Sequence, residues 1–69
     1  MIGYTKKERI LYALQGGEVL TSASALTRFH TIDLRKRVSE LRSEGYPILD
    51  KIVRSLNGEH YKEYFMEVL

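Results

Sequence analysis

The chain has 69 residues, no cysteine and a formal net charge of +2, and 43% of its residues are hydrophobic. These values predict one small α+β domain over residues 1–69 and exclude disulfide frameworks, cysteine nucleophiles and cysteine zinc sites. Because the sequence has no apolar run of about 18–20 residues and no secretory signal pattern, we expect a cytoplasmic protein without membrane contact.

The first predicted helix covers residues 6–15. Thr5 and Glu8 have the spacing of a capping box, in which a hydroxyl and a carboxylate accept hydrogen bonds from the free amides at a helix start. Gly16 and Gly17 follow the helix, and glycine is frequent where helices end. An apolar stripe at helical spacing is expected to face the core, and it consists of Ile10, Leu11 and Leu14.

Two further helices are predicted at residues 22–29 and 32–44, separated by a break of a few residues. Thr21 is a favourable amino-terminal cap for the first of them. Gly45 and Pro47 end the second, because proline cannot continue a helix. The positions expected to face the core are Ala25, Leu26 and Phe29 in the first helix and Leu34, Val38 and Leu41 in the second.

An antiparallel hairpin is predicted from residues 47–55 and 60–66. The residues before the turn favour β structure, and Asn57-Gly58 is a frequent hairpin-turn dipeptide. The register stays open, because Leu56 lengthens the loop in one alternative and a one-residue slip exchanges the two faces of a strand. The aromatic residues of the second strand are assigned mainly to packing, and they are Tyr61, Tyr64 and Phe65.

Two segments carry a resemblance to a known family. The stretch Ala25-Leu26-Thr27-Arg28-Phe29 and the run Glu40-Leu41-Arg42-Ser43-Glu44-Gly45-Tyr46-Pro47-Ile48 resemble small winged helix-turn-helix proteins common in phages and prophages. With the first helix and the hairpin, which is the wing of this fold, the resemblance extends over nearly the whole chain. It implies a DNA-binding fold. That group often has glycine where this chain has His30, so a left-handed turn there and a longer second helix both stay open.

In this architecture the third helix enters the DNA major groove, so its exposed side chains are candidate base contacts. Arg35 can donate two hydrogen bonds to a guanine edge, Lys36 can reach guanine or phosphate, and Ser39 permits close approach. The alternative is an ordinary solvated helix face with weak pairs between neighbouring charges, the role assigned to Arg37. The candidate residues on this helix are Thr31, Ile32, Arg35, Lys36, Ser39 and Arg42.

Phosphate contacts are predicted at the second helix and on the wing. Ser22 and Thr31 lie near helix starts, where backbone amides can hold an anion, and Arg28 adds a positive charge. The hairpin tip suits phosphate or the minor groove, although Glu59 and Glu63 oppose this, and the alternative is a plain hairpin that closes the core. The candidate wing residues are Arg54, Asn57, Gly58, His60 and Lys62.

The sequence shows no motif typical of an enzyme. His30 with Asp33, and His60 with Glu63, each offer two metal ligands at most, so we expect no metal site, no cofactor and no catalysis.

The predicted partner is double-stranded DNA, and the predicted role is that of a transcriptional regulator or a recombination or architectural factor. The alternative is a protein-binding winged helix, such as a phage adaptor or an inhibitor of a host factor. Because one such module buries only about 600–1,000 Å² on DNA, a homodimer or cooperative copies are also considered. The terminal residues 65–69 either form a contact strip or complete the core.

Overall fold

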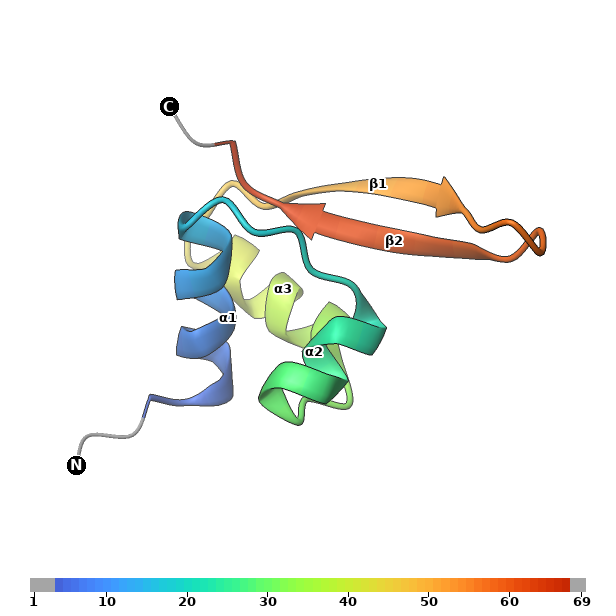
Figure 1. The fold of residues 1–69 in the computed structure, drawn as a ribbon. Helices are drawn as coiled ribbons and strands as arrows, with labels where there is room; N and C mark the ends of the chain where they lie inside the picture. Colours follow the sequence, from blue (N-terminus) through green and yellow to red (C-terminus); the bar gives the residue numbers. More distant parts are fainter. Residues whose placement is uncertain (1–3, 68–69) are drawn as a thin grey trace.

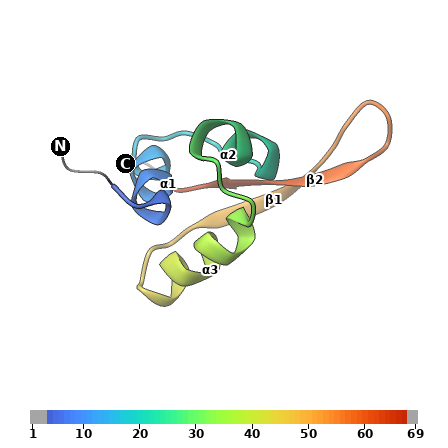
Figure 2. The same ribbon diagram turned by 90° about the horizontal axis from the view of Figure 1, so that it is seen from below.

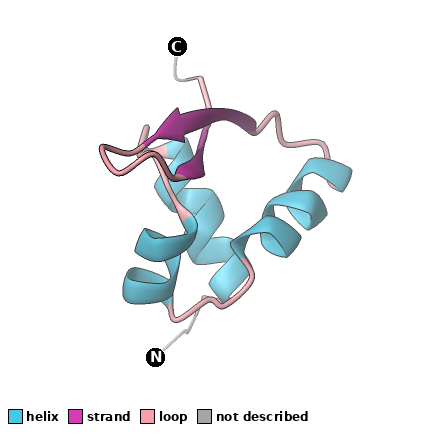
Figure 3. Ribbon diagram, turned by 90° about the vertical axis from the view of Figure 1, so that its right-hand side faces the viewer, coloured by secondary structure: helices cyan, strands magenta, loops and turns pink. Residues whose placement is uncertain are grey.

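The computed structural model describes residues 4–67 of the chain. Within them, three helices are followed by a two-stranded hairpin that covers one side of the helices and reaches beyond them (Figures 1 and 3). This confirms the predicted order of elements. The elements are α1 (Lys6–Gln15), α2 (Ser22–Phe29), α3 (Leu34–Ser43), β1 (Leu49–Arg54) and β2 (His60–Phe65).

Reciprocal side-chain caps begin the first two helices at the predicted residues. The Glu8 amide donates to Thr5 Oγ1 at 3.1 Å, and the Thr5 amide donates to the Glu8 carboxylate at 2.9 Å. Thr21 and Ser24 exchange the same pair of bonds at α2. Each cap satisfies amides that have no partner inside the helix, which fixes where the helix begins.

The third helix begins two residues later than the sequence predicts. Asp33 is its cap and accepts a hydrogen bond from the Lys36 amide at 3.1 Å, so α3 starts at Leu34. Aspartate is a strong capping residue because its carboxylate accepts bonds from the free amides of the first turn. Thr31 and Ile32 therefore lie in the turn before the helix and are not part of it.

The turn between α2 and α3 passes through a left-handed residue. His30 has φ 55° and ψ 33°, and its amide donates to the Leu26 carbonyl at 3.0 Å. Its own carbonyl accepts a bond from Lys6 Nζ at 2.7 Å, which connects the turn to the start of α1. The expectation of a left-handed turn is confirmed, and the alternative of a longer second helix is wrong.

The core joins all three helices to the sheet. The predicted rows on α1 and α3 are buried, whereas Leu26 of α2, which was predicted to face inward, is 52% exposed. Ala25 and Phe29 are four positions apart and share one face of α2, and both are buried as predicted. Leu26 lies next to this face and is directed toward solvent. The buried apolar residues are Ile10, Leu11, Ala13, Leu14, Leu20, Ala25, Phe29, Leu34, Val38, Leu41, Ile48 and Tyr64.

A β-bridge at Leu20, which no sequence pattern indicates, extends the sheet by one residue. β1 and β2 pair antiparallel with Leu49 opposite Phe65, which fixes the register. On the other edge of β2, Leu20 and Tyr64 exchange two backbone hydrogen bonds of 2.8 and 2.7 Å. The loop between α1 and α2 is therefore attached to the base of the wing.

The aromatic residues of β2 differ in burial because side chains alternate between the two faces of a strand. Tyr64 is buried against the helices and Phe65 is half-buried, but Tyr61 is 42% exposed. The assignment of Tyr61 to the core is wrong, because Tyr61 is three positions from the buried Tyr64 and therefore lies on the other face of β2. Met66 packs against the core. Residues 68 and 69 of the terminal run lie outside the described residues.

Candidate nucleic-acid interface

Two cations lie at the amino-terminal end of α3 on its exposed side. Leu34 and Val38 face the core, which leaves Arg35, Lys36 and Ser39 exposed as the spacing predicts. Within residues 4–67, neither Arg35 nor Lys36 forms an ion pair. Both side chains can therefore contact a ligand without breaking an internal salt bridge.

An open groove of about 760 Å³ separates the amino-terminal end of α2 from β2. Arg35 lines it from α3, and Lys62 and His60 line it from the wing. The first intrahelical bond of α2 is donated by Ala25, so the amide of Ser22 has no partner within the helix. The groove thus combines cationic side chains with a helix start, both of which favour an anion. Its lining residues are Thr21, Ser22, Ala23, Arg35, His60, Tyr61, Lys62 and Tyr64.

A second hollow lies on the α1 side of the α3 start. It is lined by Lys6 and Lys36 together with Ile32, Asp33 and other residues of the turn. Asp33 is occupied as the helix cap. The beginning of α3 therefore has a cation on each flank, Arg35 toward the wing and Lys36 toward α1. No local pattern in the sequence indicates Lys6 as part of this surface, because only tertiary packing brings the start of α1 to this position.

Residues 5–68 match the family described as Winged helix-turn-helix domain. The chain belongs to this family. No curated protein matches the chain, and no solved structure matches it either. In this winged helix-turn-helix domain, α2 and α3 form the helix-turn-helix, α3 has the position of the recognition helix, and the β1–β2 hairpin is the wing.

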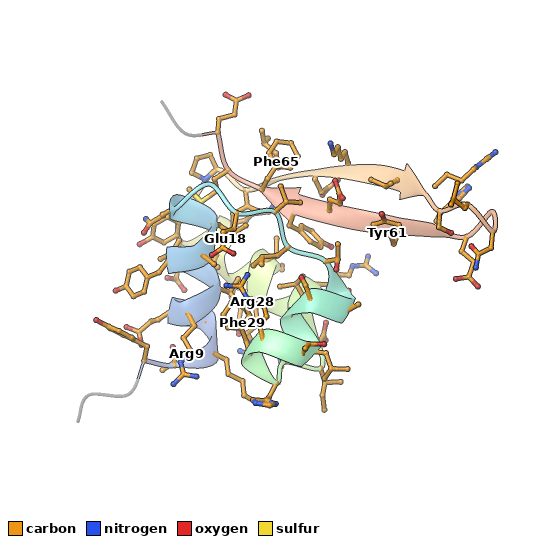
Figure 4. The ribbon with its side chains drawn as sticks, viewed as in Figure 1. Arg9, Glu18, Arg28, Phe29, Tyr61 and Phe65 are labelled. Carbon is orange, nitrogen blue, oxygen red and sulfur yellow. The ribbon has the colours of Figure 1, made fainter. Side chains whose placement is uncertain are left out.

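Arg28, a predicted phosphate contact of the helix-turn-helix, is held by an internal ion pair. Its guanidinium donates two hydrogen bonds to Glu18, at 2.5 and 3.2 Å, and lies 5.0 Å from the centroid of the Phe29 ring. Figure 4 shows the pair between the α1–α2 loop and α2. The hydrogen bond from Arg28 lowers the pKa of Glu18. The pair fastens the loop to α2, and contact of Arg28 with DNA stays a prediction.

Arg42 connects the end of the recognition helix to the base of the wing. It donates to the Ile48 carbonyl and to the Asp50 carboxylate, both at 2.9 Å. The hydrogen bond from Arg42 also lowers the pKa of Asp50. These contacts give Arg42 a structural role, and its predicted contact with DNA is untested.

The two turn residues before the recognition helix differ sharply in exposure. Thr31 is only 3% exposed, and its amide donates to the Ala25 carbonyl at 3.4 Å. Its hydroxyl has no hydrogen-bond partner in the part of the chain that the structure describes. The side chain therefore does not reach the surface where we predicted a phosphate contact. Ile32, in contrast, is 92% exposed.

The polar residues of the wing differ in how freely they can contact a ligand. Asn57 Oδ1 accepts a hydrogen bond from the Glu59 amide at 3.2 Å, so it is occupied within the loop. Arg54 Nε donates to His60 Nε2 at 3.2 Å across the two strands. Lys62 is exposed and has no ion pair among residues 4–67. Lys62 is therefore the cation of the wing that is most available for DNA.

No group of three or more histidine, aspartate or glutamate side chains in residues 4–67 could hold a metal ion. Across the same residues, no helix has the length and apolar character needed to cross a bilayer.

Proposed function

We propose that this winged helix-turn-helix domain binds duplex DNA, with α3 in the major groove and the wing against the backbone or minor groove beside it. The observation that carries the proposal is the distribution of ion-paired cations. Among the cations without an ion pair in residues 4–67, Arg35, Lys36, Lys62 and Lys6 line the two hollows beside the start of α3. The other cations without an ion pair in this part of the chain are Arg54, on the wing, and Arg9, on α1. The cations with acidic partners are Lys7, Arg28, Arg37, Arg42 and Lys51.

The dimensions of the recognition helix support this orientation. An α-helix with its side chains is about 10–12 Å across, and the major groove is about 12 Å wide. In such a complex, the two flanks of α3 face the two phosphate backbones that border the groove. Arg35 and Lys36 lie on these flanks, so both can neutralise phosphate or turn toward a base edge.

For the biological role of this DNA binding, we propose a phage-type transcriptional regulator or a recombination or architectural factor in the cytoplasm. It is a binding role without catalysis. A single module of this kind buries about 600–1,000 Å² on DNA, which gives modest affinity. We therefore propose that two or more copies act together on neighbouring sites.

The test is fluorescence anisotropy of a labelled mixed-sequence duplex over a range of salt concentrations. We expect wild-type affinity to fall steeply with salt, because bound cations release counterions from phosphate. The double variant Arg35→Glu/Lys36→Glu should bind at least about 30-fold more weakly at low salt.

A control of equal net charge is Arg9→Glu/Lys51→Glu. Arg9 lies on the side of α1 away from the wing (Figure 4), and Lys51 is on the outer face of the hairpin, where it pairs with Glu63. The control should keep most of the affinity, because its charges change away from the proposed contact surface. Equal losses in both variants would contradict the proposed surface. A folded protein that binds no duplex at low salt would favour the protein-binding alternative.

A further inference from the structure

The most exposed large apolar side chain on the wing lies at its tip. Leu56 has a relative exposure of 109%, which means that it makes almost no contact with the rest of the chain. The tip extends beyond the ends of the helices in two perpendicular views (Figures 1 and 2). Burying a leucine side chain is favourable, so a fully exposed one at the end of an arm is available to a ligand.

The loop that carries Leu56 is held in one shape by its own hydrogen bonds. The Gly58 amide donates to the Ser55 carbonyl at 3.0 Å, and the Ser55 amide donates to the Glu59 carbonyl at 2.8 Å. Ser55 Oγ also lies within hydrogen-bond distance of Asn57 Oδ1 and of the Glu59 carbonyl, and its single proton is donated to one of them at a time. Gly58 has φ 88°, a conformation that favours glycine. The polar groups of the loop thus bond to each other, and Leu56 projects from a preorganised turn.

The charges behind the tip favour DNA as the ligand. Arg54 lies opposite His60 in the last pair of the two strands, and Lys62 follows on the same face as His60. Arg54 and Lys62 are the two cations behind the tip, and Glu59 is the acidic residue of the loop. An apolar tip with Arg54 and Lys62 behind it matches the minor groove, where phosphates border a narrow cleft with apolar walls.

The length of the wing is compatible with a contact beside the recognition helix. A strand of six residues spans about 20 Å at about 3.4 Å per residue. Half a turn of B-DNA is about 17 Å, which is the offset between a major groove and the adjacent minor groove. A wing of this length is therefore long enough to span the offset between the two grooves.

We propose that Leu56 inserts into this minor groove as an apolar wedge that partly unstacks a base step and bends the duplex. The inference rests on the proposed DNA binding and adds a deformation of the DNA to it. Apolar wedges of this type open a base step on its minor-groove side and kink the duplex toward the major groove, and the deformed step is untwisted. The local unwinding gives the wedge an effect that can be measured without knowing a preferred sequence.

The test uses a relaxed circular plasmid incubated with the protein and a type I topoisomerase, followed by removal of the protein. Wedges that unwind the DNA leave negative supercoils whose number rises with bound protein. We expect wild type and Leu56→Phe, which keeps a bulky apolar tip, to produce them. Leu56→Ser should lose at least about half of them when compared at equal occupancy, measured by anisotropy on a labelled linear duplex.

The matched control is Leu49→Ser, which makes the same chemical change at the base of the wing, where Leu49 is 40% exposed. This variant should retain the supercoils. Wild-type protein that binds the duplex but leaves the plasmid relaxed would overturn the wedge and keep the proposed DNA binding. Equal supercoiling by wild type and Leu56→Ser would also overturn it. Wild-type protein that binds no duplex would overturn both proposals.

Discussion

The helices and the wing of this domain are built in different ways. The three helices share a core of buried aliphatic residues, and their starts are fixed by side-chain caps. The outer half of the wing has little burial and is held by backbone pairing and by hydrogen bonds within its loop. The helical part therefore carries most of the folding free energy, and the wing is free to expose residues that suit a partner.

Truncation of one apolar residue in each region is the strongest test of this difference. Leu14 is fully buried and Ile52 is 68% exposed. Leu14→Ala should destabilise the domain by about 2–5 kcal/mol, because it removes buried methyl groups and leaves a cavity. Domains of this size rarely exceed a stability of about 3–5 kcal/mol, so this variant should be largely unfolded. Urea denaturation followed by circular dichroism measures the effect.

The wing variant Ile52→Ala should change stability by less than about 1 kcal/mol. A loss as large as that of Leu14→Ala would mean that the wing contributes to the core as much as the helices do, and the comparison would fail.

The turns at the two ends of α3 give a second test with smaller effects. Gly45, at the end of α3 before the wing, has φ 101°. Gly45→Ala should destabilise the domain by about 1–2 kcal/mol, because a β-carbon is strained in this conformation. His30→Gly, in the left-handed turn before α3, should be neutral or raise stability by up to about 1 kcal/mol. Thermal unfolding measures both, and a loss of stability in His30→Gly would contradict the assigned turn.

The smallest expected effect is a decline in stability at acidic pH. Ion pairs with arginine lower the pKa of Glu18 and of Asp50 from the ordinary values of 4.5 and 3.8. The unfolded chain therefore binds more protons than the folded chain as these groups titrate. Their contribution is complete above pH 4.5 and is lost as the pH falls through the lowered values.

Urea midpoints measured between about pH 6 and pH 2 should reveal this decline. Glu18→Gln, which removes one pair between the α1–α2 loop and α2, should flatten the curve. Glu59→Gln is the matched control, since Glu59 of the wing has no ion pair within residues 4–67. If both variants changed the curve equally, the ion pair of Glu18 would not be the cause.

The helical part was more predictable from the sequence than the wing. Local signals such as the Thr5 cap and the row of Leu34, Val38 and Leu41 depend on residues a few positions apart, so the sequence contains them directly. The bridge between Leu20 and Tyr64 joins segments far apart in the chain, and no local pattern indicates it.

The candidate site was predictable in part for the same reason. Helical periodicity correctly indicated that Arg35, Lys36 and Ser39 are exposed. It could not show that Arg28 and Arg42 are held by acidic residues of other segments, because tertiary packing brings those partners together. The hairpin register, which places Tyr61 and Tyr64 on opposite faces of β2, was also open from the sequence.

The bridge between Leu20 and Tyr64 has a mechanical consequence. Leu20 directly precedes Thr21, the cap of α2, so the two hydrogen bonds between Leu20 and Tyr64 attach the base of the wing to the residue next to the start of α2. The two backbone hydrogen bonds between Leu20 and Tyr64 therefore couple the position of the base of β2 to the position of the start of α2. A ligand that moves the base of the wing also moves the start of the helix-turn-helix.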